Sequence, residues 1–191
     1  MANGDGTLDR RAFDGAAFGS PAVISGPDVD GINWALVRGS FMANGTLYTA
    51  QSDGTMKSWT WDGTRFVNPL SVPSWVNFSG RSALAYFNGR IFYTSTGNSR
   101  LSWRRFSLES GIVGAEEFVA DTGASGVGWN DATGLTVAGG KLYTSHSSGN
   151  LTRTDADGNG FPIPATTVAI SGPAVGDGRN WNVVDLFVFS A

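Results

Sequence analysis

Short apolar runs separated by turn residues fill most of the chain, and no stretch of ten residues keeps the apolar spacing of a helix. The segment 40–72 shows the pattern, because SFMANG, TLYTAQS, TMKSWTW and RFVNPLSV are joined through Asn-Gly and Asp-Gly pairs. Such pairs favour tight β-hairpin turns, in which both central residues have positive φ. The pattern therefore predicts four short antiparallel strands in this segment and an all-β fold for the chain.

The same pattern recurs along the chain. NGTLYTAQSDGTM, which begins at Asn44, is matched by GGKLYTSHSSGNL, which begins at Gly139. A large aromatic residue precedes the predicted innermost strand of each copy, at Trp34, Trp75, Trp129 and Trp181. Four strands in each of four copies of about 48 residues are typical of a four-bladed β-propeller. The predicted copies span residues 1–34 plus 182–191, 35–75, 76–129 and 130–181.

The two ends of the sequence complement each other. NVVDLFVFSA follows Trp181 in the way that ALVRGSFMAN follows Trp34, so the C-terminal segment is predicted to be the innermost strand of a blade. The N-terminal segment carries the outer half of the same repeat. We therefore expect one domain over residues 1–191, with the ring closed where the N- and C-terminal segments pair.

Composition narrows the classes of partner. The chain has 12% aromatic residues and 27 glycines, as an all-β fold rich in turns requires, and a formal net charge of -3. No run of basic residues exceeds two, so we expect no nucleic-acid partner. No apolar run approaches the roughly 20 residues of a membrane-spanning helix, so we expect no membrane insertion. Cysteine is absent, which excludes disulfides and thiol catalysis.

Catalytic and metal motifs are weak. The one histidine, His146, falls in the predicted turn SHSSG, and we expect it to be a solvated turn residue. The stretch DADGNG from Asp155 matches the first half of a calcium loop, but Thr166 stands where a bidentate glutamate is needed. We therefore expect no catalytic residue, no metal site and no cofactor.

The repeated tryptophans permit two interpretations. Their indoles can wedge between neighbouring blades, or they can offer apolar faces to sugar rings while nearby polar groups bind the hydroxyls. The polar pattern Asp-Gly-x-Asn precedes two of the four tryptophans. The candidate ligand-binding residues are Trp34, Asn33, Asp30, Trp181, Asn180, Asp177, Trp75 and Trp129.

The local pattern NG-x-LYT-x(4)-G-x-L resembles propeller repeats near the C-termini of large secreted actinobacterial proteins. The number of blades is similar to that of the hemopexin-like fold, although the repeat signature and closing disulfide of that family are not present. The resemblance implies an extracellular or surface-associated accessory module that binds a glycan or another surface ligand. The sequence starts with a polar stretch rather than a signal peptide, so an export signal would have to lie outside it.

These observations predict a non-catalytic binding module, with carbohydrate as the leading ligand class. The alternative is a structural or protein-interaction propeller, of the kind used in adhesion or on virion surfaces, with no small-molecule ligand. A protein partner is compatible with both.

Overall fold

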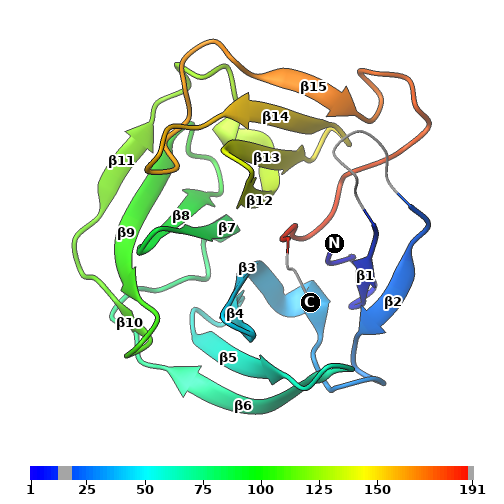
Figure 1. Cartoon of the computed structure of the whole chain (residues 1–191), viewed down its shortest axis with the longest axis vertical. Coiled ribbons are helices and arrows are strands. Elements are labelled where there is room, and N and C mark those ends of the chain that lie inside the picture. Colours follow the sequence, from blue (N-terminus) through cyan, green and yellow to red (C-terminus); the bar gives the residue numbers. More distant parts are fainter. Residues whose placement is uncertain (13–18, 189–191) are drawn as a thin grey trace.

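The computed structural model describes residues 1–12 and 19–188. The C-terminal segment predicted to be an innermost strand forms no continuous strand over residues 182–188, where only Asp185 takes part in a β-bridge, and its last three residues lie outside the described range. The all-β prediction is confirmed. Figure 1 shows the sheets arranged around a central axis, as in a four-bladed β-propeller. Every strand pair is antiparallel. No helix in the described ranges is long and apolar enough to cross a membrane.

Three of the sheets have four or five strands. The first is β3 (Val37–Ala43), β4 (Thr46–Gln51), β5 (Met56–Trp61) and β6 (Phe66–Val72). The second is β7 (Arg81–Phe87), β8 (Arg90–Ser95) and β9 (Leu101–Ser107), with β10 (Ile112–Val113) and β11 (Phe118–Asp121) both paired to β9. The third is β12 (Ala132–Ala138), β13 (Lys141–His146), β14 (Leu151–Asp155) and β15 (Val168–Ser171).

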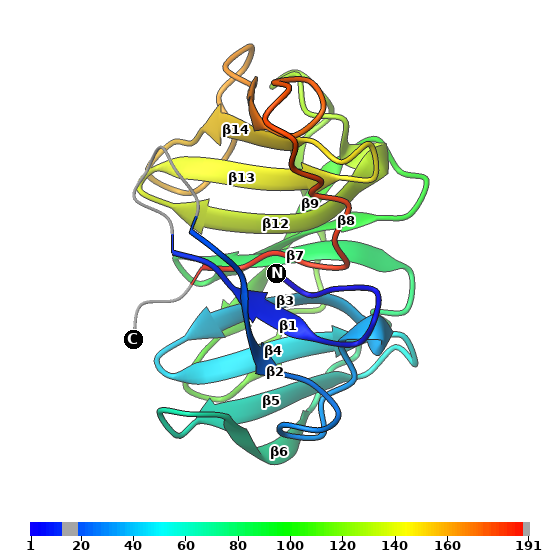
Figure 2. The same ribbon diagram turned by 90° about the vertical axis from the view of Figure 1, so that its right-hand side faces the viewer.

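The fourth sheet has two strands, both from the N-terminal part of the chain, and the C-terminal segment is bridged to residue Ala2 beside it. Its strands β1 (Leu8–Arg10) and β2 (Ala22–Ser25) pair with each other, and Ala2 forms bridges to Leu8 and to Asp185. The Ala2 amide donates to the Asp185 carbonyl at 2.9 Å, and the Val184 amide donates to the Ala2 carbonyl at 2.8 Å. Figure 2 shows the N-terminus beside the C-terminal segment. The two terminal segments are thus hydrogen-bonded to each other.

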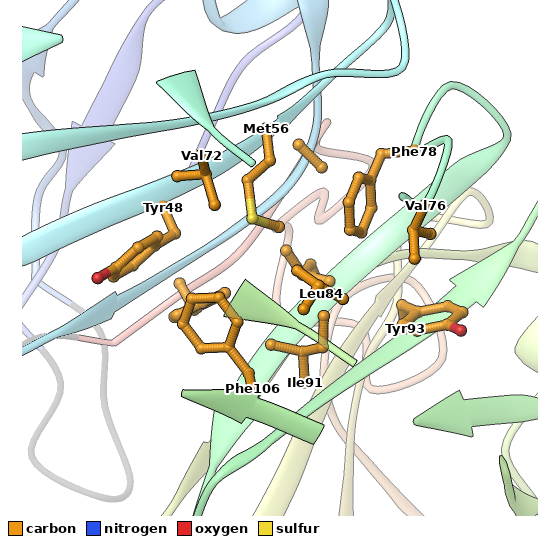
Figure 3. Packing of buried hydrophobic residues seen from close by; sticks show 12 residues of the cluster. Tyr48, Met56, Val72, Val76, Phe78, Leu84, Ile91, Tyr93 and Phe106 are labelled. Atoms are coloured by element: carbon orange, nitrogen blue, oxygen red, sulfur yellow. The ribbon is translucent and has the colours of Figure 1, made fainter. Parts of the chain in front are cut away.

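The hydrophobic core lies between the sheets, because each sheet has apolar residues on both faces. Between the β3–β6 and β7–β11 sheets, Phe41 stacks on Tyr48 with ring centroids 4.9 Å apart, and Phe106 meets both rings edge-on. Figure 3 shows this cluster, with Met56 and Leu84 at its centre. Similar clusters fill the other three junctions. This arrangement explains why a single repeat could not bury its apolar surface alone.

The innermost segments approach one another closely around the axis. A Cβ atom added at Gly39 of β3 would lie 2.6 Å from the Leu84 Cβ of β7. A Cβ added at Gly134 of β12 would lie 2.6 Å from the Leu186 amide nitrogen of the C-terminal segment. Glycine is therefore required at these two positions by the close contact of neighbouring inner strands.

Two short 3-10 helices, η1 (Trp34–Leu36) and η2 (Trp129–Asp131), lead into β3 and β12. They place Trp34 and Trp129 at the entrance to these innermost strands, as the sequence predicts for these two residues.

Candidate functional site

The first Asp-Gly-x-Asn-Trp segment forms a hydrogen-bonded corner. The Trp34 ring is fully buried, and its Nε1 donates to the Ser25 Oγ at 2.7 Å. The Ser25 Oγ donates to the Asp30 Oδ1 at 2.9 Å, and the Gly26 amide donates to the same oxygen at 3.2 Å. The Asn33 Oδ1 accepts from the Ala35 amide at 3.1 Å and so caps η1. Trp34, Asn33 and Asp30 thus hold the connection between β2 and β3.

The second such segment repeats this arrangement. The Trp181 Nε1 donates to the Ser171 Oγ at 2.6 Å, and that hydroxyl donates to the Asp177 Oδ2 at 2.6 Å. The hydrogen bond from Ser171 is the main reason that the pKa of Asp177 is lowered to about 2. The Asn180 Oδ1 accepts from the Asn182 amide at 2.9 Å. The pattern that suggested sugar ligation is therefore used to build two matching corners.

A third corner uses a carboxylate directly. The Trp129 Nε1 donates to the Asp121 Oδ2 at 2.7 Å, and the Ser125 Oγ donates to the same oxygen at 2.6 Å. Burial alone would raise the pKa of Asp121, but the bonds from Ser125 and Trp129 hold it below its usual value. Sequence reasoning missed Asp121, because it lies eight residues before the tryptophan and outside the shared pattern.

The sugar-platform interpretation of three tryptophans is wrong for this structure. Trp34, Trp129 and Trp181 are only 0%, 1% and 3% exposed, so none presents a ring face to a ligand. The physical reason is that each indole fills the space between two sheets and anchors its Nε1 to a buried acceptor. Asn33, Asn180 and Asp177 are exposed, but without an indole face beside them they lack the apolar half of a sugar site.

We expect the indole hydrogen bonds to matter for stability. Trp129→Phe keeps an aromatic ring but removes the donor to Asp121, and it should lower the free energy of unfolding by about 1–3 kcal/mol. Urea unfolding measures the change, with Trp75→Phe as a control at an exposed tryptophan. Equal urea midpoints for Trp129→Phe and Trp75→Phe would show that the hydrogen bond from Trp129 to Asp121 does not stabilise the fold.

Trp75 differs from the other three, because 92% of it is exposed. The residue that takes the corner position is Phe78: its amide donates to the Gly54 carbonyl at 3.0 Å, as the Trp34 amide does to Gly6 and the Trp181 amide to Gly149. Phe78 is fully buried. Alignment on tryptophan alone placed Trp75 three residues too early, and its indole has no packing role of the kind seen at the other corners.

The segment that carries Trp75 is firmly held. Val76 and Phe78 pack into the core cluster that also contains Tyr93 and Leu84, as Figure 3 shows. The Val76 amide donates to the Ser74 Oγ at 3.0 Å on the other side of Trp75. The exposed indole therefore stands on an ordered connection between β6 and β7.

A charged cluster adjoins this connection, which leads directly into Arg81 of β7. Three guanidinium groups surround the Glu117 carboxylate: those of Arg104 at 3.0 Å, Arg100 at 3.4 Å and Arg81 at 3.7 Å. The Tyr93 hydroxyl also donates to Glu117, at 2.8 Å, and the Arg81 guanidinium lies 4.5 Å from the Tyr93 ring centroid. The cluster has three positive charges against one carboxylate.

The cluster shifts the pKa values of its members. Burial would raise the pKa of Glu117, but hydrogen bonds from Tyr93, Ser102 and Arg104 and the charge of Arg81 lower it. Burial and the bond to Glu117 raise the pKa of Tyr93 to about 12. Glu117 is therefore ionised and Tyr93 neutral across the physiological range. These residues come from four strands or their ends, so no local motif marks them in the sequence.

The prediction of a solvated His146 is wrong. The side chain is 5% exposed, its Nδ1 lies 2.9 Å from the Asp131 Oδ1, and its Nε2 lies 2.9 Å from the Thr152 Oγ1. A carboxylate, an imidazole and a hydroxyl are thus connected in the order found in catalytic triads. The hydroxyl of this set belongs to Thr152, which lines neither the 720 Å³ nor the 420 Å³ cavity. The imidazole links η2, β13 and β14. The expectation that the chain is not an enzyme stays a prediction.

The calcium-like stretch forms a turn. The Asp157 Oδ1 accepts from the amides of Asn159 and Phe161 at 2.8 and 2.9 Å. The Asp155 carboxylate pairs with the Lys141 ammonium at 2.6 Å. Within residues 1–12 and 19–188, no group of three or more His, Cys, Asp or Glu side chains could hold a metal ion.

Two cavities among the described residues bear on function. The larger, of about 720 Å³, lies between the β1–β2 and β12–β15 sheets and is lined by apolar residues such as Leu8, Ile24 and Leu151 with Arg10 and Arg11. The smaller, of about 420 Å³, is lined by residues of β3, β7, β12 and the C-terminal segment, among them Arg38, Ser82, Thr133 and Asn182.

No protein-family model matches the sequence, and no curated protein matches it. Among solved structures, a chain of a nidogen/laminin complex is 11% identical with a TM-score of 0.46, over 93% of this chain and 61% of that chain. A calcium-binding protein, regucalcin, from Agrobacterium tumefaciens is 12% identical with a TM-score of 0.41, over 62% and 40%. The WD40 β-propeller domain of Doa1 is 11% identical with a TM-score of 0.38, over 62% and 37%.

The chain thus spans less than two thirds of each of these structures, and similarity of this size carries no conclusion about ligand or activity. The resemblance to secreted actinobacterial propellers and to the hemopexin-like fold stays a prediction.

Proposed function

We propose that this chain is a non-catalytic binding module that recognises a glycan through Trp75. The observation that carries the proposal is the 92% exposure of this indole on an anchored connection. Tryptophan side chains are highly buried on average, so an indole this exposed stands apart from the other repeated tryptophans. A flat indole face suits the apolar C–H face of a pyranose ring, as a binding site for sugar requires.

Polar groups suited to sugar hydroxyls come from the same end of the β7–β11 sheet. The Arg100 side chain is 44% exposed, and the one hydrogen bond it makes within the described part of the chain uses Nη2. A guanidinium has five N–H donors, so most of those on Arg100 remain for a ligand. We also propose an extracellular or surface-associated location, as for a module that recognises glycans of cell surfaces.

Removing the Trp75 ring tests this proposal. Trp75→Ala should weaken the binding of a glycan identified on an array by about tenfold or more, because aromatic anchors dominate such contacts. Its melting temperature should match that of the parent, since the indole is exposed. Leu70→Ala, at a residue that is 67% exposed on neighbouring β6, is the matched control and should bind normally.

Two results would contradict glycan recognition at Trp75. One is a parent protein that binds no glycan on a broad array. The other is an array ligand that Trp75→Ala binds as tightly as the parent does.

The second candidate function is protein interaction, which a different observation favours. The outer strands of all four sheets carry exposed aliphatic side chains: Val23, Leu70, Ile112, Val119 and Val168, with 45–67% exposure. Outer strands also have unpaired backbone groups on which another chain can dock. This alternative would be supported if the protein can be cross-linked chemically to a protein partner, if this cross-link is lost in Leu70→Ser or Val119→Ser, and if a glycan array is negative.

We also propose that the four predicted repeats are the blades and that the terminal segments close the ring. The hydrogen bonds between Ala2 and the 184–185 segment support closure. So does the contact between the rings of Phe187 and Trp34, whose centroids lie 6.0 Å apart.

A further inference from the structure

The three innermost strands share an irregularity at the same place. The pairing register shifts between Val37 and Gly39 in β3, between Arg81 and Ala83 in β7, and between Ala132 and Gly134 in β12. The residues within these bulges are Arg38, Ser82 and Thr133. A bulge leaves one residue out of the ladder and redirects its side chain, and bulges are common beside functional sites.

The redirected residues meet at the centre of the molecule. Arg38, Ser82 and Thr133 line the cavity of about 420 Å³ together with Asn182 and Val183 of the C-terminal segment. Figure 1 shows β3, β7, β12 and this segment surrounding the axis. Three sheets and the C-terminal segment thus each contribute a polar side chain to one opening, which is the convergence expected of a ligand site.

Arg38 is the one charged residue in the lining of this cavity. Its hydrogen bonds to the described residues both use Nη1, which donates to the carbonyls of Ala35 at 3.3 Å and Val37 at 3.2 Å. These bonds orient the guanidinium and leave Nε and Nη2 for a ligand. The paired N–H groups of a guanidinium match the two oxygens of a carboxylate.

The hydroxyl groups beside Arg38 are also held in position. The Ser82 Oγ lies 2.8 Å from the Thr94 Oγ1, and the Thr133 Oγ1 lies 3.1 Å from the Ser145 Oγ. Each hydroxyl has one donor and two acceptor positions, so each can also bind a ligand oxygen. Asn182 adds an exposed amide. These neutral donors suit a ligand with a single negative charge.

Nearby carboxylates do not oppose an anion in the cavity. Asp5 follows the lining residue Gly4 and accepts from the Thr7 amide and hydroxyl, while Asp131 pairs with His146. Asp185 is fully buried against Ser40 and does not line the cavity. Burial raises its pKa to about 8, so it is largely neutral at pH 7.

We infer that the axial cavity is a binding site for a small organic carboxylate, anchored by Arg38 and bordered by Ser82, Thr133 and Asn182. This site is separate from Trp75, so it is independent of the proposed glycan recognition. One guanidinium and a few neutral donors in an open cavity should give millimolar affinity, on the order of 1 mM.

The test is a titration followed by two-dimensional NMR of the backbone amides. Lactate and gluconate should cause saturable shifts at Gly39, Ala83, Gly134 and Val183, whereas the uncharged methyl lactate should not. Arg38→Met should weaken binding by about tenfold or more. Arg38→Lys should give an intermediate loss, because lysine keeps the positive charge but lacks the paired N–H groups of the guanidinium. Arg65→Met removes an equal charge from an exposed side chain and should bind as the parent does.

Three results would overturn the inference. The first is the absence of saturable shifts with any carboxylate. The second is equal binding by the Arg38→Met and Arg65→Met variants. The third is saturation by phosphate and sulfate alone, which would exclude a carboxylate as the ligand. If Arg38→Met perturbs the spectrum beyond the cavity, the comparison of Arg38→Lys with the parent decides between the outcomes.

Discussion

Asp185→Asn will stabilise the protein at pH 8 and leave its stability nearly unchanged at pH 4. Asp185 is fully buried, and its Oδ1 has no hydrogen-bond partner among the described residues, while Oδ2 accepts from the Ser40 hydroxyl. Burial raises the pKa of this carboxyl to about 8. An amide has nearly the same shape but no charge to bury, so the substitution removes the cost of ionisation.

The sign of the effect follows from proton binding. The pKa of Asp185 is about 8 in the folded protein and about 3.9 in an unfolded chain. Between these values the folded state binds more protons, so the contribution of Asp185 to stability falls as the pH rises. The slope is at most about 1.4 kcal/mol per pH unit, and the contribution is constant below and above this window.

The Met1 ammonium acts in the opposite direction. Burial lowers its pKa to about 6 from 8.0, so its contribution to stability rises between those pH values. The two effects oppose each other between pH 6 and pH 8. The unfolding free energy of the parent would therefore change little with pH in this range, although both groups titrate. The difference in unfolding free energy between Asp185→Asn and the parent reports the carboxyl group together with its Coulombic interaction with the Met1 ammonium.

Urea unfolding from pH 4 to pH 8 measures this difference. Asp53→Asn is the control of opposite sign, because the side-chain and backbone hydrogen bonds from Thr55 lower the pKa of that exposed carboxylate. It should be mildly destabilising near neutral pH. If Asp185→Asn destabilises the protein equally at pH 4 and pH 8, the buried carboxyl is not a source of pH-dependent instability.

The sequence predicted those parts of the fold that depend on local geometry. The Asn44–Gly45 and Asn88–Gly89 pairs have positive φ at both residues, 51° and 73° in the first and 47° and 74° in the second. These turns require residues that tolerate this conformation, so their positions are readable from the sequence. The repeat then indicates the strands on either side.

The candidate sites could not be predicted in the same way. Arg81, Arg100 and Glu117 lie in separate parts of one repeat, and their association depends on how β7, β9 and β11 align. The partners of His146 come from neighbouring elements for the same reason. The exchange of Trp75 for Phe78 at one corner also escapes pattern matching, because either aromatic side chain can fill an apolar space.

A chain that ends at residue 182 should lose cooperative folding. Deletion of residues 183–191 removes the hydrogen bonds of the 184–185 segment to Ala2 and three apolar side chains that pack against the inner layer. Among these, Leu186 contacts the cluster around Trp181, and the Phe187 ring stacks on Trp34. Their loss exposes the edges of inner strands, which favours aggregation.

The size of this effect follows from the proposed closure of the ring. The truncated protein keeps three complete sheets, but the buried faces next to the gap become exposed on both sides, at Trp34 and at Leu151. Truncation of one large core side chain already costs about 2–5 kcal/mol, and whole domains are stable by only about 5–15 kcal/mol. Loss of the buried Leu186, of the partly buried Val184 and Phe187 and of the backbone bonds together is therefore expected to unfold the protein.

Circular dichroism melting and size-exclusion chromatography test the truncation, and a rescue experiment separates closure from simple destabilisation. A synthetic peptide with the sequence of residues 181–191 should restore a cooperative melt when it is added during refolding, because it can pair with Ala2 without being joined to the chain. The same peptide with Leu186 and Phe187 replaced by Ala should not. If the truncated protein melts cooperatively at the parent's temperature without the peptide, the C-terminal segment does not close the ring, and three sheets with the N-terminal strands form a stable unit by themselves.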